Sequence, residues 1–430
     1  MSALPLFAVP HAPALADRLA LLRDDCIASW QATPAELPRL GPPATRWRQW
    51  RNARATSRLI DELATRVDAY PEDASARREW RDVVRRRLQD FGEARFGWPS
   101  GYRSLLFGDA YYEASVDFSR RARAFDPSLP LDDLWQALRN VWIGNSLQML
   151  VSRTPTLTPA LFAYSMLYPV TDNLLDATDV SSDDKRAFNR RLGQRLMGEH
   201  PVAERDAETR AFELVAHIET EFPRHRFPDV WESVLAIHRG QVASLQQHGG
   251  ALADEQLLDI SFAKGGASVL ADLYLVRGAA TPAEERFAFG YGVFLQLLDD
   301  LQDVTADLLA GHQTLFTDAA QRGRLDELTA RLALFIDVVL DMNRDFAGVG
   351  TDDCIDLIRR NCRALLVGVI AEQPNRFSRA FRRLVERQWP LGFLAMRRLK
   401  RRAQHRFQTT AQRLQTERGV ASPLDLLQTD

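Results

Sequence analysis

Four aspartates are concentrated in one stretch of otherwise apolar sequence, residues 287–309. Their intervals place them within about a 100° arc of a single helix: Asp299, Asp300, Asp303 and Asp307. Phe, Tyr, Val and Leu occupy nearly all other sides of this helix, which predicts that it is buried. Because an unpaired buried charge costs several kcal/mol, these carboxylates must be protonated or neutralised by cations. Clustered carboxylate oxygens suit hard divalent cations such as Mg²⁺.

A second acidic stretch lies earlier in the chain. Asp172, Asp176 and Asp179 are spaced i, i+4 and i+7, which puts them within about 60° of the circumference of a helix. Apolar residues flank them in the sequence. A solvent-facing helix rarely carries three acids without a cation on one stripe, because like charges at i and i+4 repel each other. Two such helices predict a site for Mg²⁺ and for a substrate that is itself a polyanion.

Acidic clusters also arise for a simpler reason, and this chain contains an example. Residues 352–356, Asp-Asp-Cys-Ile-Asp, match the pattern D-D-x-x-D but directly follow Gly350 and Thr351. We interpret them as the first turn of a helix, where the helix dipole favours acids. A metal site is therefore expected only where the acids lie in the middle of an apolar helix and a second acidic helix is present.

At these residues the chain resembles the class I isoprenoid synthase superfamily. Residues 294–303, Phe-Leu-Gln-Leu-Leu-Asp-Asp-Leu-Gln-Asp, are similar to the F-Q-x-x-D-D-x-x-D motif of trans-prenyltransferases and, in the same register, to the D-x-x-x-D motif of squalene and phytoene synthases. Residues 307–315 resemble the D-x-x-x-G-K-x-T-L stretch that follows in prenyltransferases, with His312 in place of the lysine. Lys264-Gly-Gly-Ala-Ser resembles the upstream lysine motif. The resemblance covers residues 130–375 approximately.

The resemblance implies an all-α class I isoprenoid synthase-like bundle that ionises an allylic prenyl diphosphate and releases pyrophosphate. The implied Mg²⁺ ligands are the seven aspartates of the two stretches, and four of these are the implied catalytic carboxylates: Asp172, Asp176, Asp299 and Asp303. Lys264, Gln296 and one of Arg190 and Arg191 would contact the diphosphate. For Gln296 the alternative is a hydrogen-bonded core residue, and for the two arginines it is a solvated surface position.

Two departures from the family pattern select among the possible activities. The first motif is D-x-x-x-D rather than D-D-x-x-D, and no N-terminal Gly-Lys-Arg segment for isopentenyl diphosphate is present. We therefore expect a terpene synthase that cyclises or eliminates. The alternatives are a prenyl-coupling transferase of the squalene/phytoene synthase or polyprenyl diphosphate synthase type, and a non-catalytic helical binding protein. Aromatic residues of the same helices would line the cavity or belong to the core: Phe162, Tyr164, Tyr168, Phe262, Tyr274, Phe289, Tyr291 and Phe294.

Helical patterns dominate the chain and strand patterns are nearly absent. The elements that must position the acids are helices expected at about 159–180, 254–277 and 282–310, separated from their neighbours by Pro, Gly or Asx turns. We divide the chain into a helical N-terminal extension (1–125), a catalytic bundle (126–375) and a basic helical C-terminal tail (376–430).

The overall composition limits the classes of partner and the cellular location that we expect for this protein. A formal net charge of −2 over 430 residues argues against a nucleic-acid binder. Three unpaired cysteines, no signal-peptide pattern and no long apolar run predict a cytoplasmic protein. The basic tail suggests either a helix docked on acidic partners or one that rests on an anionic membrane. A second copy of the chain, forming a homodimer, is also considered as a partner.

Overall fold

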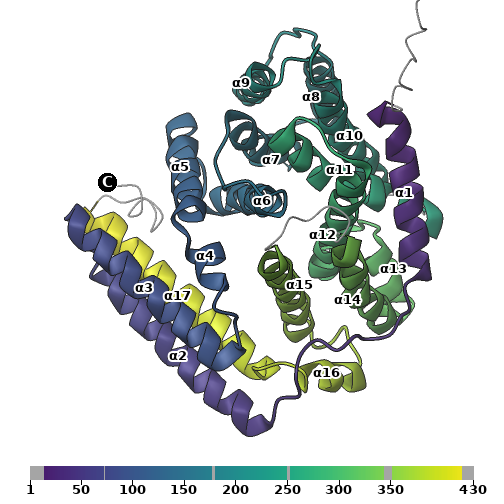
Figure 1. Cartoon of the computed structure of the whole chain (residues 1–430). Coiled ribbons are helices and arrows are strands. Elements are labelled where there is room, and N and C mark those ends of the chain that lie inside the picture. Colours follow the sequence, from purple (N-terminus) through teal and green to yellow (C-terminus); the bar gives the residue numbers. More distant parts are fainter. Residues whose placement is uncertain (1–13, 72, 177–179, 249–251, 343–350, 419–430) are drawn as a thin grey trace, which may run out of the picture.

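All regular elements that the structure describes are helices, which confirms the all-α prediction. The computed structural model describes residues 14–71, 73–176, 180–248, 252–342 and 351–418. Figure 1 shows a rounded body of packed helices and, beside it, a long arm of three helices. No helix in these ranges combines the length and the apolarity needed to cross a membrane. The three cysteines are buried free thiols.

The centre of the body is an antiparallel pair, α11 (Asp254–Arg277) and α12 (Pro282–Ala310). α12 begins where Thr281 accepts a hydrogen bond from the Glu284 backbone amide, and it ends at Gly311, whose φ of 68° is the left-handed conformation that glycine adopts readily. The two helices approach closely at Gly265 and Gly292. A Cβ atom on Gly292 would lie 2.2 Å from the Gly265 carbonyl oxygen, so only glycine permits this packing.

Further helices surround this pair. The neighbours with a bearing on the site are α6 (Leu131–Leu150), α7 (Pro159–Asp176), α10 (Pro228–Ser244), α14 (Leu325–Asp341) and α15 (Asp352–Glu372). α6 and α7 run antiparallel, since Asn140 donates to Ser165 at 3.1 Å and Asn173 donates to Asp133 at 2.6 Å. The C-terminal end of α7 therefore lies at the N-terminal end of α6.

Helix α1 (Leu15–Ala32), within the N-terminal extension of the sequence division, packs on the body. Trp30 packs edge-on against Phe335 of α14, with ring centroids 5.3 Å apart, and against Phe262 of α11. Arg18 donates to Glu285 of α12 at 2.6 Å, and Glu285 is 2% exposed. The first helix thus covers the central pair directly.

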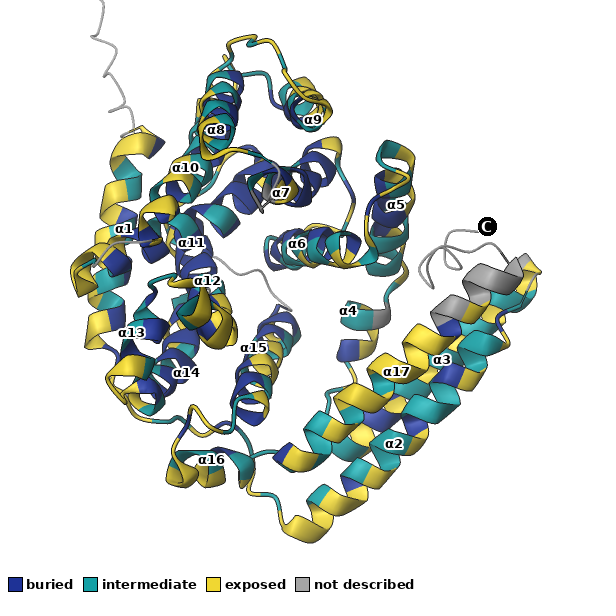
Figure 2. Cartoon of the chain, turned by 180° about the vertical axis from the view of Figure 1, so that it is seen from behind, coloured by how far each residue is buried: buried dark blue, intermediate teal, exposed yellow. Residues whose placement is uncertain are grey.

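The arm brings together sequence from both ends of the described chain: α2 (Arg46–Asp68), α3 (Ala74–Phe96) and α17 (Phe393–Arg418). Arg402 of α17 pairs with Asp61 of α2 at 2.7 Å, and Arg87 of α3 pairs with Glu62 at 3.0 Å. Figure 2 shows buried residues concentrated in the body, whereas the arm is mostly intermediate or exposed. Helices from the N-terminal extension (1–125) and from the C-terminal tail (376–430) therefore pack against each other.

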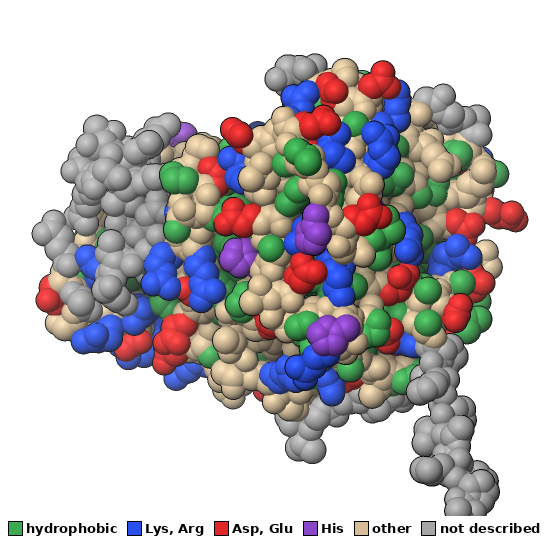
Figure 3. All heavy atoms as spheres, turned by 90° about the horizontal axis from the view of Figure 1, so that it is seen from above, with side chains coloured by type: hydrophobic (Ala, Val, Ile, Leu, Met, Phe, Trp, Pro, Cys, Tyr) green, Lys and Arg blue, Asp and Glu red, His purple; other side chains and the backbone are tan. Residues whose placement is uncertain are grey.

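The other helices connect or cover these parts. They are α4 (Tyr102–Phe107), α5 (Asp109–Phe125), α8 (Ser182–Leu196), α9 (Asp206–Glu221), α13 (Leu315–Gln321), α16 (Arg379–Glu386) and a short 3₁₀ helix, η1 (Leu245–Gln247). Acidic and basic side chains are interspersed over the face of the molecule in Figure 3, in keeping with a net charge near zero.

Candidate functional site

The acidic stripe of α12 divides into accessible and buried members. Asp299 and Asp303 are exposed, Asp307 is partly buried, and Asp300 is buried at 6% exposure. Neither Asp299 nor Asp303 forms a hydrogen bond or an ion pair with a described residue. Their carboxylate oxygens are therefore available to a ligand from solvent.

Asp300 and Gln296 are engaged with each other inside the helix pair. Gln296 Nε2 donates to Asp300 Oδ1 at 2.8 Å, and Ser261 Oγ of α11 donates to Asp300 Oδ2 at 3.4 Å. Burial raises the pKa of Asp300 to about 7 despite the hydrogen bond from Gln296 and the positive charge of Lys264, while Asp299 and Asp307 raise this pKa further. Both residues thus have a role in packing α11 against α12. The hydrogen bond to Asp300 agrees with the second of the two roles considered for Gln296, that of a hydrogen-bonded core residue.

Asp299 and Asp303 share an electrostatic environment with two cations. Surrounding protein atoms reduce hydration and raise the pKa of Asp299, an effect opposed by Lys264 and Arg139. Loss of hydration also raises the pKa of Asp303; the negative charges of Asp299 and Asp307 add to the rise, and Arg139 opposes it. The stripe is a set of carboxylates that repel one another and are incompletely neutralised by the protein.

Lys264 and Arg139 come from two different helices. Lys264 lies where α11 approaches α10 closely: a Cβ atom on Gly240 would be 2.7 Å from the Lys264 Cα atom. Arg139 extends from α6 and is exposed. Lys264 was predicted from the sequence as a candidate site residue, whereas Arg139 was not. The available signal was the same for both: a lone cation inside an apolar helical run, here Ala137-Leu-Arg139-Asn-Val141.

His312, which stands where the resembling motif has a lysine, is directed to the acidic stripe. Its Nδ1 lies 3.2 Å from Asp307 Oδ1, and its ring stacks on His248 with centroids 4.4 Å apart. Asp307 therefore has a partner within the protein, which Asp299 and Asp303 do not have among the described residues.

The first acidic stretch is described only in part. The backbone of Asp172 and Asp176 belongs to the last turns of α7, but the structure does not describe their side chains. Asp179 lies outside the described residues. Between them, the Asn173 side chain contacts Asp133 of α6. Arg139, six residues further along α6 and hence about 9 Å along its axis, acts on Asp299 and Asp303. One short segment of α6 thus contacts α7 and carries a charge that influences the carboxylates of α12.

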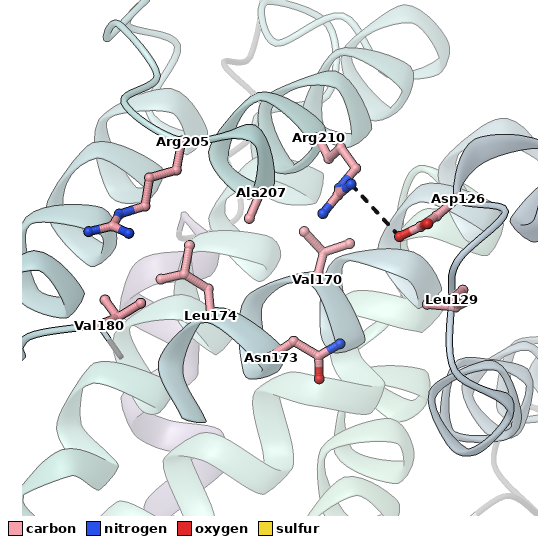
Figure 4. A pocket seen from close by; sticks show the side chains of 9 residues that line it. All are labelled: Asp126, Leu129, Val170, Asn173, Leu174, Val180, Arg205, Ala207 and Arg210. Carbon is pink, nitrogen blue, oxygen red and sulfur yellow. Dashed lines mark ion pairs between the residues drawn. The ribbon is translucent and has the colours of Figure 1, made fainter. Parts of the chain in front are cut away.

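A pocket of about 240 Å³ lies between α7 and α9 (Figure 4). Val170, Asn173 and Leu174 line it from α7, and Arg210 of α9 reaches Asp126 across it at 3.9 Å.

The two arginines considered for diphosphate binding are on α8. Arg191 pairs with Glu208 at 2.6 Å and with Glu204 at 3.0 Å, and Glu208 is fully buried, so this arginine joins α8 to α9. Arg190 is exposed. Among the described contacts, none connects either arginine to Lys264 or to the α12 carboxylates.

The aromatic candidates divide between core and partly open positions. Phe262, Tyr274, Phe289 and Phe294 are at most 2% exposed, and the Tyr274 hydroxyl donates to Glu285, so these four are core. Tyr164 donates to the Ser268 carbonyl oxygen at 3.0 Å, and Tyr168 is 45% exposed. The second D-D-x-x-D pattern begins α15, as predicted, and Asp356 there accepts from Tyr102 at 2.8 Å.

The donor set at α12 fits a hard cation. Two accessible carboxylates can supply oxygen ligands, and Mg²⁺ commonly takes one or two carboxylates together with phosphate oxygens and water. Among the described side chains, which do not include those of Asp172 and Asp176, no three acidic, histidine or cysteine side chains form a group that could hold a metal ion. No protein-family model matches this chain, and no curated protein sequence matches it.

Proposed function

We propose that this chain is a Mg²⁺-dependent class I isoprenoid synthase that ionises an allylic prenyl diphosphate, releases pyrophosphate and then cyclises the carbocation or eliminates a proton. The observation that carries the proposal is the segment Asp133–Arg139 of α6. It contacts Asn173, between the two α7 aspartates, and it acts on Asp299 and Asp303 of α12. One helical segment thus contacts α7 next to its two aspartates and, through the charge of Arg139, influences the aspartates of α12.

The charges of the site suit a leaving group with several negative charges. Lys264 contributes a compact ammonium group and Arg139 a planar guanidinium group to the electrostatic environment of the α12 carboxylates. Both groups can donate hydrogen bonds to diphosphate oxygens. Asp299 and Asp303 from α12, with Asp172 and Asp176 from α7, would hold Mg²⁺. When bound, Mg²⁺ acts as a Lewis acid that neutralises the departing diphosphate. The carbon–oxygen bond then breaks, and its electron pair leaves with the diphosphate.

The assignment of roles follows from accessibility. Asp299 and Asp303 are exposed and unpartnered among described residues, whereas Asp300 is buried and bound to Gln296. Metal binding is therefore assigned to the first two, and helix packing to Asp300 and Gln296. Asp307, in contact with His312, is a weaker candidate for a metal ligand.

The test is incubation of the purified protein with Mg²⁺ and, separately, geranyl, farnesyl and geranylgeranyl diphosphate. Pyrophosphate release and the extracted products are measured, with EDTA in place of Mg²⁺ as the control. The proposal expects Mg²⁺-dependent pyrophosphate and a hydrocarbon or alcohol of unchanged carbon number. A product of doubled or extended carbon number would favour a coupling enzyme, and binding of a prenyl diphosphate without turnover would favour a non-catalytic binding protein.

A further inference from the structure

Helix α2 carries a basic and aromatic surface that the proposed catalytic site does not use. Trp47, Trp50, Arg51, Arg54 and Arg58 follow one another at i, i+3, i+4, i+7 and i+11 and so occupy a single face of the helix. We call these five residues the Arg/Trp face. All five are exposed, Trp47 at 63% and Trp50 at 54%.

This face points away from the packing of the arm. The opposite side of α2 is fixed by Gln49, which donates to the Glu386 carbonyl oxygen at 2.8 Å, and by Asn52, which donates to the Pro390 carbonyl oxygen at 3.0 Å. Leu59 on that side is buried. The Arg/Trp face is therefore held rigidly at the surface by contacts that do not involve it.

The positive charge of the Arg/Trp face is not neutralised within the described chain. No acid occurs between residues 46 and 60, and none of Arg51, Arg54 and Arg58 has an ion pair with a described carboxylate. On α17 several cations are paired: Arg402 and Arg406 pair with Asp61, and Lys400 pairs with Glu372. Arg397, Arg398 and Arg401 of α17 also have no ion pair with a described carboxylate, so the Arg/Trp face differs from α17 in that none of its three arginines is paired and two exposed indoles lie among them.

The two indoles are already associated with guanidinium groups. Arg51 lies over the Trp47 ring at 4.4 Å from its centroid, and Arg54 lies over the Trp50 ring at 4.8 Å. One face of each ring is thus covered by a cation, which leaves less ring surface for the base stacking that single-stranded nucleic acids use. Tryptophan and arginine side by side on a convex helix match the headgroup region of a bilayer, where an indole is partly buried and a guanidinium meets phosphate.

We propose that the Arg/Trp face binds the surface of an anionic lipid bilayer. The occupant is a membrane rather than a protein groove or a nucleic acid, because this exposed helix face combines uncompensated cations with two exposed indoles. The face lies on the arm, apart from α11 and α12 in the body (Figure 1), so this proposal does not rest on the proposed enzyme activity.

The test is flotation of the full-length protein with vesicles of phosphatidylcholine alone and with vesicles in which phosphatidylglycerol replaces part of it. Binding to the anionic vesicles only, weakened by high salt, is expected. Replacing Arg51, Arg54 and Arg58 with Gln should weaken it roughly a hundredfold, at about fivefold for each cation near an anionic surface. Trp47→Gln with Trp50→Gln should also weaken it.

Matched controls remove the same groups from other surfaces. Arg186→Gln, Arg226→Gln and Arg239→Gln together remove three exposed arginines of the body, and Trp135→Gln removes an exposed indole of α6. These variants should bind anionic vesicles like the wild type. The proposal is overturned if the wild type does not bind anionic vesicles or if the controls lose as much binding as the α2 variants. It is also overturned if an oligonucleotide binds through the Arg/Trp face while vesicles do not.

Discussion

Gln296 Nε2 donates a hydrogen bond of 2.8 Å to Oδ1 of Asp300, one turn further along α12. This contact makes adjacent aspartates unequal. Asp300 is buried against Ser261 of α11, whereas Asp299 faces solvent beside Lys264 and Arg139. A stripe of four similar acids in the sequence is therefore two kinds of residue in the folded chain.

Asp299→Asn should abolish pyrophosphate release while leaving the fold intact. Loss of a carboxylate that holds Mg²⁺ removes several kcal/mol of charge stabilisation, a drop in kcat of about a thousandfold or more. Asp352→Asn, in the acidic pattern that begins α15, is the matched control and should keep wild-type turnover. Equal activity in the two variants would remove Asp299 from the site.

Arg139→Gln should lower kcat/KM for the prenyl diphosphate by roughly 10- to 100-fold. The physical reason is the loss of one charge-assisted hydrogen bond to diphosphate, worth about 1.5–3 kcal/mol. Lys264→Gln should give a similar loss. Steady-state kinetics at saturating Mg²⁺ measure the effect, and Arg23→Gln, at a partly buried arginine of α1, provides the comparison. Unchanged kinetics in the Arg139 variant would show that this residue does not meet the substrate.

Asp272→Asn should make the protein more stable, and increasingly so as the pH rises. Burial raises the pKa of Asp272 well above its usual range, Asn140 donates to its Oδ1 at 3.0 Å, and its Oδ2 has no hydrogen-bond partner. Above a pH of about 4 the unfolded chain releases this proton while the folded chain retains it, so the free energy of unfolding falls with rising pH. Asparagine cannot titrate. Urea unfolding of both proteins over a range of pH measures the difference, and a constant difference would contradict the assignment.

Arg18→Met should destabilise the body by about 3–5 kcal/mol, because it leaves the buried Glu285 without its cation. Arg23→Met, which breaks solvent-accessible pairs with Asp24 on the same helix and with Asp259 of α11, should cost about 1 kcal/mol or less. Chemical unfolding gives both values. If the Arg18 variant were as stable as the Arg23 variant, α1 would not be an integral part of the bundle.

Local sequence signals predicted the helices well. The expected segments 254–277 and 282–310 coincide with α11 and α12, because Thr281 and Pro282 mark the start of α12, and Gly278 and Gly311 end the two helices. The start of α15 at the second acidic pattern was predicted for the same kind of reason. These signals act within one or two turns and are visible in the sequence itself.

The contacts between helices that are distant in the sequence could not be predicted from such local signals. Nothing near Arg139 in the sequence indicates that α6 brings it beside Asp299, and the ion pair between Asp61 and Arg402 joins residues far apart in the chain. The separation of Asp300 from Asp299 likewise depends on Ser261 of another helix. Such contacts are set by how helices cross, which hydrophobic periodicity alone does not determine.

The most direct measurement is a crystal structure of the protein with Mg²⁺ and inorganic pyrophosphate. The proposal predicts Mg²⁺ about 2.0–2.1 Å from carboxylate oxygens of Asp299 or Asp303. It also predicts a carboxylate of Asp172 or Asp176 on the other side of the same pyrophosphate, with Lys264 or Arg139 on its oxygens. Pyrophosphate bound elsewhere, or the α7 and α12 aspartates directed to separate surfaces in that complex, would contradict the shared site.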